Sequence, residues 1–120
     1  MNILIKRFLE NCFHDVWVLA SVENMDRYYS KSVTGIFNDE PVSRKDIEDQ
    51  CNWCNDNEKI TGVVFPDVIA EDNKIAFRVQ LSFTDQDGVQ KAAENMMIYH
   101  LDEEGKIYKI WKKSSEKLSD

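Results

Sequence analysis

The stretch KIAFRVQLSFTD, residues 74–85, decides the fold class of this protein. Apolar and polar residues alternate through it, and strict alternation is the pattern of a β-strand with one buried face. Turn sequences bound it on both sides, EDNK (71–74) and DQDG (85–88), and an Asp-Gly pair is a strong hairpin signal. We therefore predict a strand that pairs through a tight turn with the segment after it. Its apolar face consists of Ile75, Phe77, Val79, Leu81 and Phe83.

The segments on either side extend this pattern into a sheet. QKAAENMMIYHL (90–101) and IYKIWKKS (107–114), joined by the turn DEEGK, predict two further antiparallel strands. Upstream, ITGVVFPDVIAED (60–72) is rich in β-branched residues. Pro66 in its middle predicts an edge position, a bulge or a bend, because proline has no N–H to donate to a strand ladder. The polar tail SEKLSD (115–120) is expected to be frayed.

The first half of the chain has a helical period. Residues 2–20 place apolar side chains at i, i+3, i+4 and i+7, which predicts an amphipathic helix. A short second helix is expected over 22–29 with Ser21 as its cap, followed by a short strand over 33–39. A third helix is expected over 44–56, because Ser43 and Asp46 form a capping-box pattern. Helices followed by an antiparallel meander predict an α+β fold in one domain, residues 1–120.

Composition excludes several function classes. The formal charge of −7 and a pI of about 4.8 argue against nucleic-acid binding, which rests on clustered Lys and Arg. No window reaches the roughly 18 apolar residues that a membrane span needs, so we expect no membrane partner. The start of the sequence lacks a signal-peptide pattern, and three cysteines suit a reducing compartment. We therefore expect a cytoplasmic location.

The motif CNWC, residues 51–54, allows a redox dithiol, half of a metal site, or two small apolar residues on one helix face. It lies late in the predicted third helix, whereas reactive dithiols sit at a helix N-terminus. Ile47, Cys51 and Cys54 share the i, i+4, i+7 face, which favours core packing. Neither a second C-x-x-C nor a histidine pair is present to complete a zinc site, so we expect no metal and no cofactor. Trp53, offset in phase, is expected to turn toward a pocket mouth.

The order of elements resembles the nuclear transport factor 2-like superfamily, and within it the SnoaL-like (polyketide cyclase and ketosteroid isomerase-like) branch. The likeness is carried by the helical FLE opening (8–10), by MDRYYSKSV (25–33), and most strongly by YHLDEEGKIYKIW (99–111) with its G-K-I turn. The resemblance implies three N-terminal helices packed on a strongly curved antiparallel sheet, a cystatin-like cone with a pocket at its open end. It also implies a homodimer formed through the outer sheet face.

The catalytic residues of this superfamily do not carry over. Alignment to the ketosteroid isomerases places Phe13 and Met97 where the two oxyanion donors would stand, and Phe37 at the position of the base, next to Asn38 and Asp39. The aspartate of the polyketide cyclases falls at Ser115, four residues after Trp111. Phenylalanine and methionine cannot donate to an oxyanion, and an unaided serine is no base at neutral pH. Whether the protein is an enzyme is therefore left open.

Strand parity predicts which residues face the pocket. If Tyr99 points inward, so do Asn95 and Met97; on the last strand, alternation puts Ile107 and Trp111 on one face. His14 and Asp15, adjacent on the first helix, and Asp39 are the candidate catalytic residues. The residues expected to line a ligand pocket are Phe13, Trp17, Tyr28, Trp53, Asn95, Met97, Tyr99 and Trp111.

Three functions compete on this basis. The first is the binding of a small hydrophobic or aromatic ligand in a cone-shaped pocket. The second is a dimeric interaction module whose cone is filled by its own side chains. The third is an isomerase- or cyclase-type enzyme with a non-standard catalytic set. An outward apolar stripe on the last two strands would serve the second, and alternation predicts it at Met96, Ile98, Tyr108 and Ile110.

Overall fold

The computed structural model of the protein describes residues 3–118 and has the expected α+β architecture. The strands that it describes form one sheet in the order β2-β1-β6-β5-β4-β3. All neighbouring strands run antiparallel except β1 and β6, which are parallel. The elements are α1 (Ile3–Cys12), η1 (Phe13–Val18), η2 (Val22–Arg27), β1 (Tyr29–Phe37), β2 (Glu40–Val42), α2 (Arg44–Asn57), β3 (Glu58–Glu71), β4 (Lys74–Asp85), β5 (Gln90–Leu101) and β6 (Ile107–Leu118).

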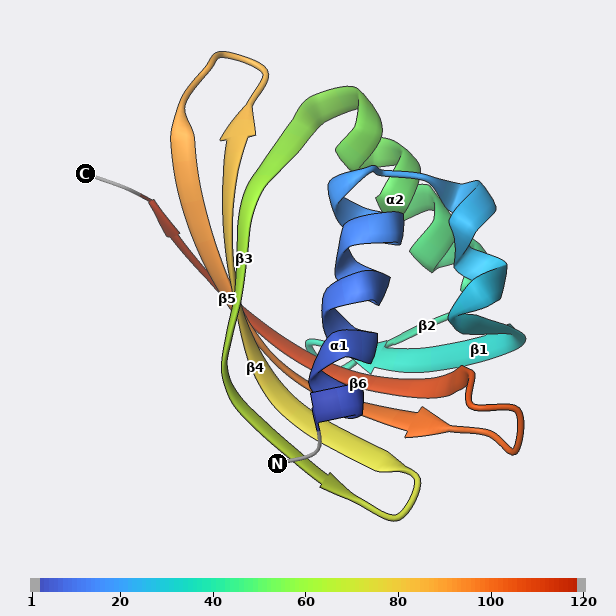
Figure 1. The fold of residues 1–120 in the computed structure, drawn as a ribbon. Coiled ribbons are helices and arrows are strands. Elements are labelled where there is room, and N and C mark those ends of the chain that lie inside the picture. Colours follow the sequence, from blue (N-terminus) through green and yellow to red (C-terminus); the bar gives the residue numbers. More distant parts are fainter. Residues whose placement is uncertain (1–2, 119–120) are drawn as a thin grey trace.

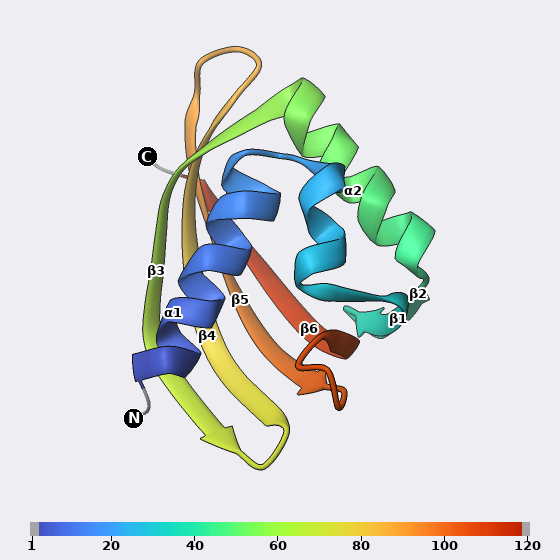
Figure 2. The same cartoon turned by 45° about the vertical axis from the view of Figure 1, so that its right-hand side comes forward.

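The sheet is strongly curved, and the helices lie on its concave side (Figures 1 and 2). The long strands β3 to β6 bend around α1, while α2 lies across the upper end of the concave side in these views. Alternation places the apolar residues of β4 and β5 on the concave face, where they bury against the helices. The core therefore lies inside the curve, and the convex face is left to solvent or to a partner.

The helical segments differ in detail from the prediction. The single helix expected over 2–20 is α1 followed by a π-helical segment, η1, whose end shows in the bonds from Leu19 N to His14 O (3.0 Å) and from Ser21 N to Val16 O (3.0 Å). The second helix, η2, is a 3-10 helix, and the Ser21 side chain makes no capping bond.

The capping box of α2 is confirmed. Asp46 N donates to Ser43 Oγ (3.2 Å), and Ser43 N donates to Asp46 Oδ2 (2.8 Å). The CNWC motif lies on this helix, and the core-packing interpretation of its cysteines is also confirmed, since Cys51 and Cys54 are buried on the same face as Ile47.

Pro66 lies where a strand can hold it. β3 is an edge strand, and its register with β4 shifts between Val64 and Asp67, so the proline stands at an irregularity of the ladder. Of the three predicted alternatives, an edge position, a bulge or a bend, the first two are found together. The turns after β4 and β5 contain Gly88 (φ +79°) and Gly105 (φ +80°), in the left-handed region that favours glycine.

A bulge in β6 overturns the parity predicted for the last strand. His100 pairs with Lys109 while Leu101 pairs with Ile107, so β6 holds one extra residue at this point. An extra residue reverses the faces of all residues after it. Ile110, expected outward, is therefore buried (2% exposed), and Trp111, expected in the pocket, lies on the convex face (38% exposed).

β6 continues to Leu118, which pairs with Lys91, so the strand is longer than the predicted 107–114. The frayed tail stays a prediction, and residues 119–120 lie outside the described range. None of the helices within residues 3–118 is long and apolar enough to cross a membrane.

Candidate functional site

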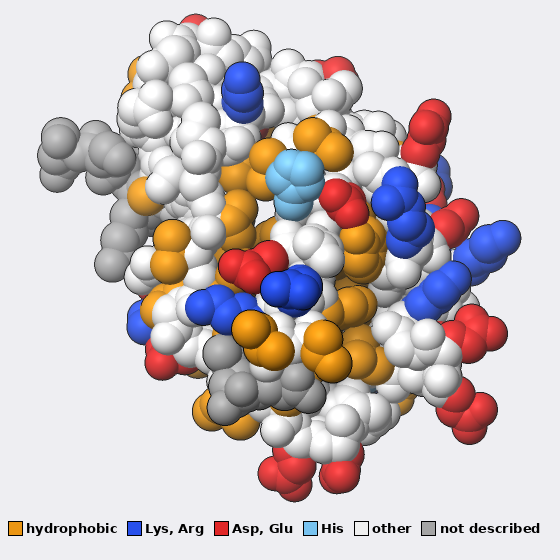
Figure 3. All heavy atoms as spheres, viewed as in Figure 1, with side chains coloured by type: hydrophobic (Ala, Val, Ile, Leu, Met, Phe, Trp, Pro, Cys, Tyr) orange, Lys and Arg blue, Asp and Glu red, His pale blue; other side chains and the backbone are white. Residues whose placement is uncertain are grey.

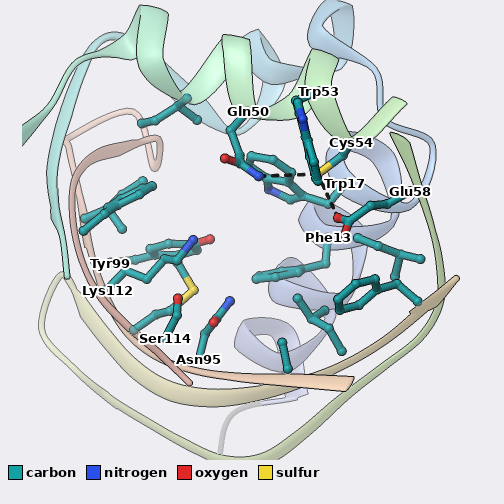
Figure 4. Close-up of a pocket in the computed structure, with 18 of the residues that line it drawn as sticks. Phe13, Trp17, Gln50, Trp53, Cys54, Glu58, Asn95, Tyr99, Lys112 and Ser114 are labelled. Carbon is teal, nitrogen blue, oxygen red and sulfur yellow. Dashed lines mark hydrogen bonds between the residues drawn. The ribbon is translucent and has the colours of Figure 1, made fainter. Parts of the chain in front are cut away.

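A cavity of about 400 Å³ lies between the concave face of the sheet and the helices. Side chains from η1, β1, α2, β3, β4, β5 and β6 line it, and Figure 4 shows ten of them by name. Figure 3, viewed as in Figure 1, shows hydrophobic side chains exposed between the sheet and the helices. Acidic and basic side chains surround them. Six of the eight residues predicted for the pocket line it: Phe13, Trp17, Trp53, Asn95, Met97 and Tyr99.

The other two predicted pocket residues lie elsewhere. The bulge places Trp111 on the convex face, and Tyr28 lies between η2 and β1, where its hydroxyl donates to the Asp15 carboxylate. Tyr29, the first residue of β1, faces the cavity in its place.

The candidate catalytic residues lie outside the cavity lining. Asp15 Oδ1 is 3.0 Å from His14 Nδ1, and the exposed His14 side chain faces solvent. Hydrogen bonds from Tyr28 and His14 lower the pKa of Asp15, because they stabilise its charged form. Asp39, in the turn between β1 and β2, forms an ion pair with Lys113 (2.8 Å). These contacts fit a structural role, and a catalytic role stays a prediction.

Buried hydroxyl groups form a chain that ends at the cavity. Trp17 Nε1 donates to Tyr29 Oη (3.0 Å), and Cys12 Sγ donates more weakly to the same oxygen (3.7 Å). Tyr29 Oη lies 3.4 Å from Tyr99 Oη, and either can be the donor. Because the Tyr29 oxygen already accepts twice, we assign its proton to the bond with Tyr99. The Tyr99 proton is then free to point into the cavity.

Burial raises the pKa of Tyr29 and of Tyr99 well above the usual value of 10, because a phenolate would lose its hydration there. Both phenols are therefore neutral at physiological pH. A neutral phenol keeps its proton and can act as a hydrogen-bond donor toward a ligand oxygen.

β5 and β6 contribute further polar side chains to the cavity. Asn95 and Ser114 are paired across the two strands, as are Met97 and Lys112, and all four line the cavity. Sequence reasoning missed Lys112 and Ser114 because the β6 bulge reverses their face. Nothing in IYKIWKK marks that bulge, since an apolar residue is found at either parity.

Lys112 is the distinctive charge of the site. Its Nζ lies 4.7 Å from the centre of the Phe37 ring, a cation–π contact. Burial lowers its pKa, while the neighbouring Cys54 raises it to a smaller extent. Among the described residues no carboxylate forms an ion pair with Lys112. The other charged cavity residues are Lys91, which pairs with Asp85 (3.4 Å), and Glu58, which accepts a weak bond from Cys54 Sγ (3.8 Å).

The cysteines of the CNWC motif are buried, and Cys54 lines the cavity. Burial raises the pKa of Cys51 to about 11 and also raises the pKa of Cys54, so both stay protonated thiols at neutral pH. Cys54 lines the cavity next to Gln50, whose side-chain amide contacts its sulfur at 3.7 Å. The site thus offers hydrogen-bond donors and an aromatic wall, and its thiols act as apolar surface.

Comparison with known proteins supports the fold. No protein-family model matches the sequence, and no curated protein is detectably similar to it. Solved structures do match. A proposed isomerase from Rhodopseudomonas palustris superposes with a TM-score of 0.77 at 11% identity, covering 96% of this chain and 91% of that one. TsrD from Streptomyces laurentii superposes with a TM-score of 0.75 at 11% identity, with coverage of 96% and 91%.

A SnoaL-like polyketide cyclase from Agrobacterium tumefaciens superposes with a TM-score of 0.69 at 13% identity, covering 96% of this chain and 93% of that one. Identities this low establish a shared architecture and leave activity open. The matches extend over nearly the whole described chain and include the curved sheet with helices on its concave face. The protein therefore has a nuclear transport factor 2-like, SnoaL-like fold.

Proposed function

We propose that this protein binds a small, predominantly apolar or aromatic molecule in its cone. The observation that carries the proposal is the open cavity of about 400 Å³ on the concave side of the sheet. Small-molecule sites are typically concave, about 300–1,000 Å³ in volume, and lined by apolar side chains with a few polar groups. The aromatic walls here include Phe13, Trp17 and Phe83, and the polar groups include Asn95 and Tyr99.

The residues aligned with the catalytic positions of the ketosteroid isomerases favour ligand binding without that catalysis. Phe13, Phe37 and Met97 all line the cavity, and none of them can transfer a proton. Structures that this chain resembles are named as isomerases and polyketide cyclases, and that chemistry would need a different catalytic set here. An enzyme of that kind is the alternative to a binding protein.

Isothermal titration calorimetry with a neutral aromatic probe, 2-naphthamide, tests the proposal. We expect saturable binding with one molecule per chain. Ala93→Phe, which places a ring in the cavity, should abolish the heat signal, whereas Ala92→Phe, at the neighbouring position on the opposite strand face, should not. Gln50→Trp at the exposed α2 side of the cavity is a second blocking variant if Ala93→Phe does not fold. No saturable binding to the native chain would refute the proposal.

A second candidate, self-assembly through the convex face, is favoured by the register of the sheet. One row of directly paired residues crosses all the described strands and is apolar throughout. Rows that carry charged residues flank it on both sides: one contains Asp67, Arg78, the apolar Met96 and Lys113, and the other contains Lys74, His100 and Lys109. An apolar centre with a polar rim is the usual anatomy of a protein interface. The apolar row consists of Ile69, Ala76, Ile98, Trp111, Ile36 and Pro41.

We propose a second copy of the chain as the occupant of this face, because a patch that spans the sheet can pack against itself around a two-fold axis. Sedimentation velocity tests it. We expect the native chain to be a dimer and Trp111→Asp to be a folded monomer. Val89→Asp, an equivalent change at an exposed apolar position outside the row, should remain dimeric. A monomeric native chain, or a dimeric Trp111→Asp variant, would contradict the assignment.

A further inference from the structure

We propose that the ligand of the cavity is an apolar or aromatic carboxylate, and that Lys112, Asn95 and Ser114 bind its anionic group. The inference rests on the proposed function and specifies the chemical class of the ligand. It comes from the polar wall that β5 and β6 present to the cavity, where each of these three side chains can donate a hydrogen bond.

The first argument is the unpaired ammonium group. Lys112 lines the cavity, is half-buried, and has only the Phe37 ring and an uncharged thiol near it among the groups that the structure describes. A desolvated charge without a counter-ion costs free energy, and an anion supplied by a ligand removes that cost. The other cavity lysine, Lys91, already has Asp85 as its partner, so Lys112 is the better anchor for an anion.

The second argument is the pair of polar side chains that line the same wall of the cavity as Lys112. Asn95 is 8% exposed, and its side-chain amide has no hydrogen-bond partner among the described residues, although it faces the cavity (Figure 4). The unpaired amide atoms remain accessible from the cavity, so they are available to bond a bound molecule or water. Ser114 lies directly across from Asn95 in the ladder, and its backbone N–H donates to Asn38 Oδ1 (2.8 Å), which holds this part of β6 in place.

The third argument is the distribution of charge. Figure 4 shows Glu58 on the opposite side of the cavity from Lys112, Ser114 and Asn95, so the donors and the acidic side chain occupy different walls. One ammonium group matches a singly charged carboxylate better than a doubly charged phosphate, whose second charge would stay uncompensated. The remaining wall is aromatic and aliphatic, which suits an apolar body attached to that carboxylate.

A matched ligand pair tests the assignment. We expect 2-naphthoate to bind the native chain about tenfold or more tightly than the isosteric neutral 2-naphthamide, since a hydrogen bond to a charged group contributes about that much. Lys112→Met keeps the approximate length of the side chain and removes its charge, so it should abolish the preference by weakening naphthoate binding far more than naphthamide binding. Lys109→Met, the same change at an exposed position of the same strand, should leave the preference intact.

Each outcome separates the two proposals. Equal affinity of acid and amide for the native chain, or a preference that survives in Lys112→Met, overturns the carboxylate assignment and leaves small-molecule binding standing through the amide. No binding of either probe overturns both. Naphthamide binding to Lys112→Met also shows that the variant is folded; if it does not fold, Lys112→Gln replaces it. Asn95→Leu, which removes only the amide, should weaken naphthoate more than naphthamide.

Discussion

The chain of buried hydroxyl groups predicts that the same substitution, tyrosine to phenylalanine, lowers the free energy of unfolding by different amounts at two positions. Tyr29→Phe and Tyr99→Phe each remove one hydroxyl from a side chain that is 1% exposed. Tyr29 Oη contacts Trp17, Cys12 and Tyr99, whereas Tyr99 Oη has Tyr29 as its only hydrogen-bond partner in the described chain. The volume change is the same at both positions, so any difference in stability reflects hydrogen bonding.

The magnitudes follow from the groups left behind. Without Tyr29 Oη, the Trp17 N–H loses its acceptor, and an unpaired buried donor costs about 1–3 kcal/mol. The lost Cys12 contact adds less, because a thiol is a weak donor. We expect Tyr29→Phe to lower the free energy of unfolding by about 2–3 kcal/mol. Tyr99→Phe loses one long bond of 3.4 Å and leaves the Tyr29 proton without that acceptor, so its expected cost is about 1–2 kcal/mol.

Urea unfolding followed by far-UV circular dichroism measures both variants, and this signal avoids the fluorescence of Trp17, which the substitution itself perturbs. Naphthoate affinity, measured by calorimetry, should change in the opposite order. Tyr99→Phe removes the proton that points into the cavity and should weaken binding more than Tyr29→Phe does. The reasoning fails if Tyr99→Phe costs as much stability as Tyr29→Phe, because the bonds from Trp17 and Cys12 to Tyr29 Oη would then contribute nothing measurable.

Three further predictions follow. Naphthoate affinity should fall as the pH rises through the pKa of Lys112, because the neutral amine forms no ion pair with the carboxylate. Burial holds that pKa below its usual 10.5. Calorimetry over a pH series measures the fall, and the affinity of Lys112→Met should not change over the same range. Cys12 and Cys51, with pKa values raised to about 12 and about 11, should react with a disulfide reagent at pH 8 about 100-fold or more slowly in the folded than in the unfolded protein. A fast thiol in the native chain would contradict this. Ser43→Ala should cost about 1 kcal/mol by removing the α2 capping box, whereas Ser115→Ala on exposed β6 should be neutral in the same urea assay.

The candidate site was partly accessible from the sequence. Parity within β5 correctly placed Asn95, Met97 and Tyr99 on the concave face, because that strand pairs regularly with β4 along its whole length. The same reasoning failed in β6, where one extra residue turns Trp111 outward and Lys112 inward. The charged group on which the proposed carboxylate site depends was therefore missed.

Features that depend on near neighbours in the chain could be predicted from the order of residues alone. Alternation in residues 74–85 predicted β4, and the Ser43–Asp46 pair predicted the start of α2. Pro66 limited its strand to an edge position, a bulge or a bend. Period, capping and a missing donor all act over a few residues. The remaining features depend on contacts between segments that are far apart in the chain. The β6 bulge is set by pairing with β5, and the Trp17–Tyr29–Tyr99 chain joins η1, β1 and β5. The open cavity exists because the sheet's curvature holds its concave face away from the helices, a distance that no local pattern encodes.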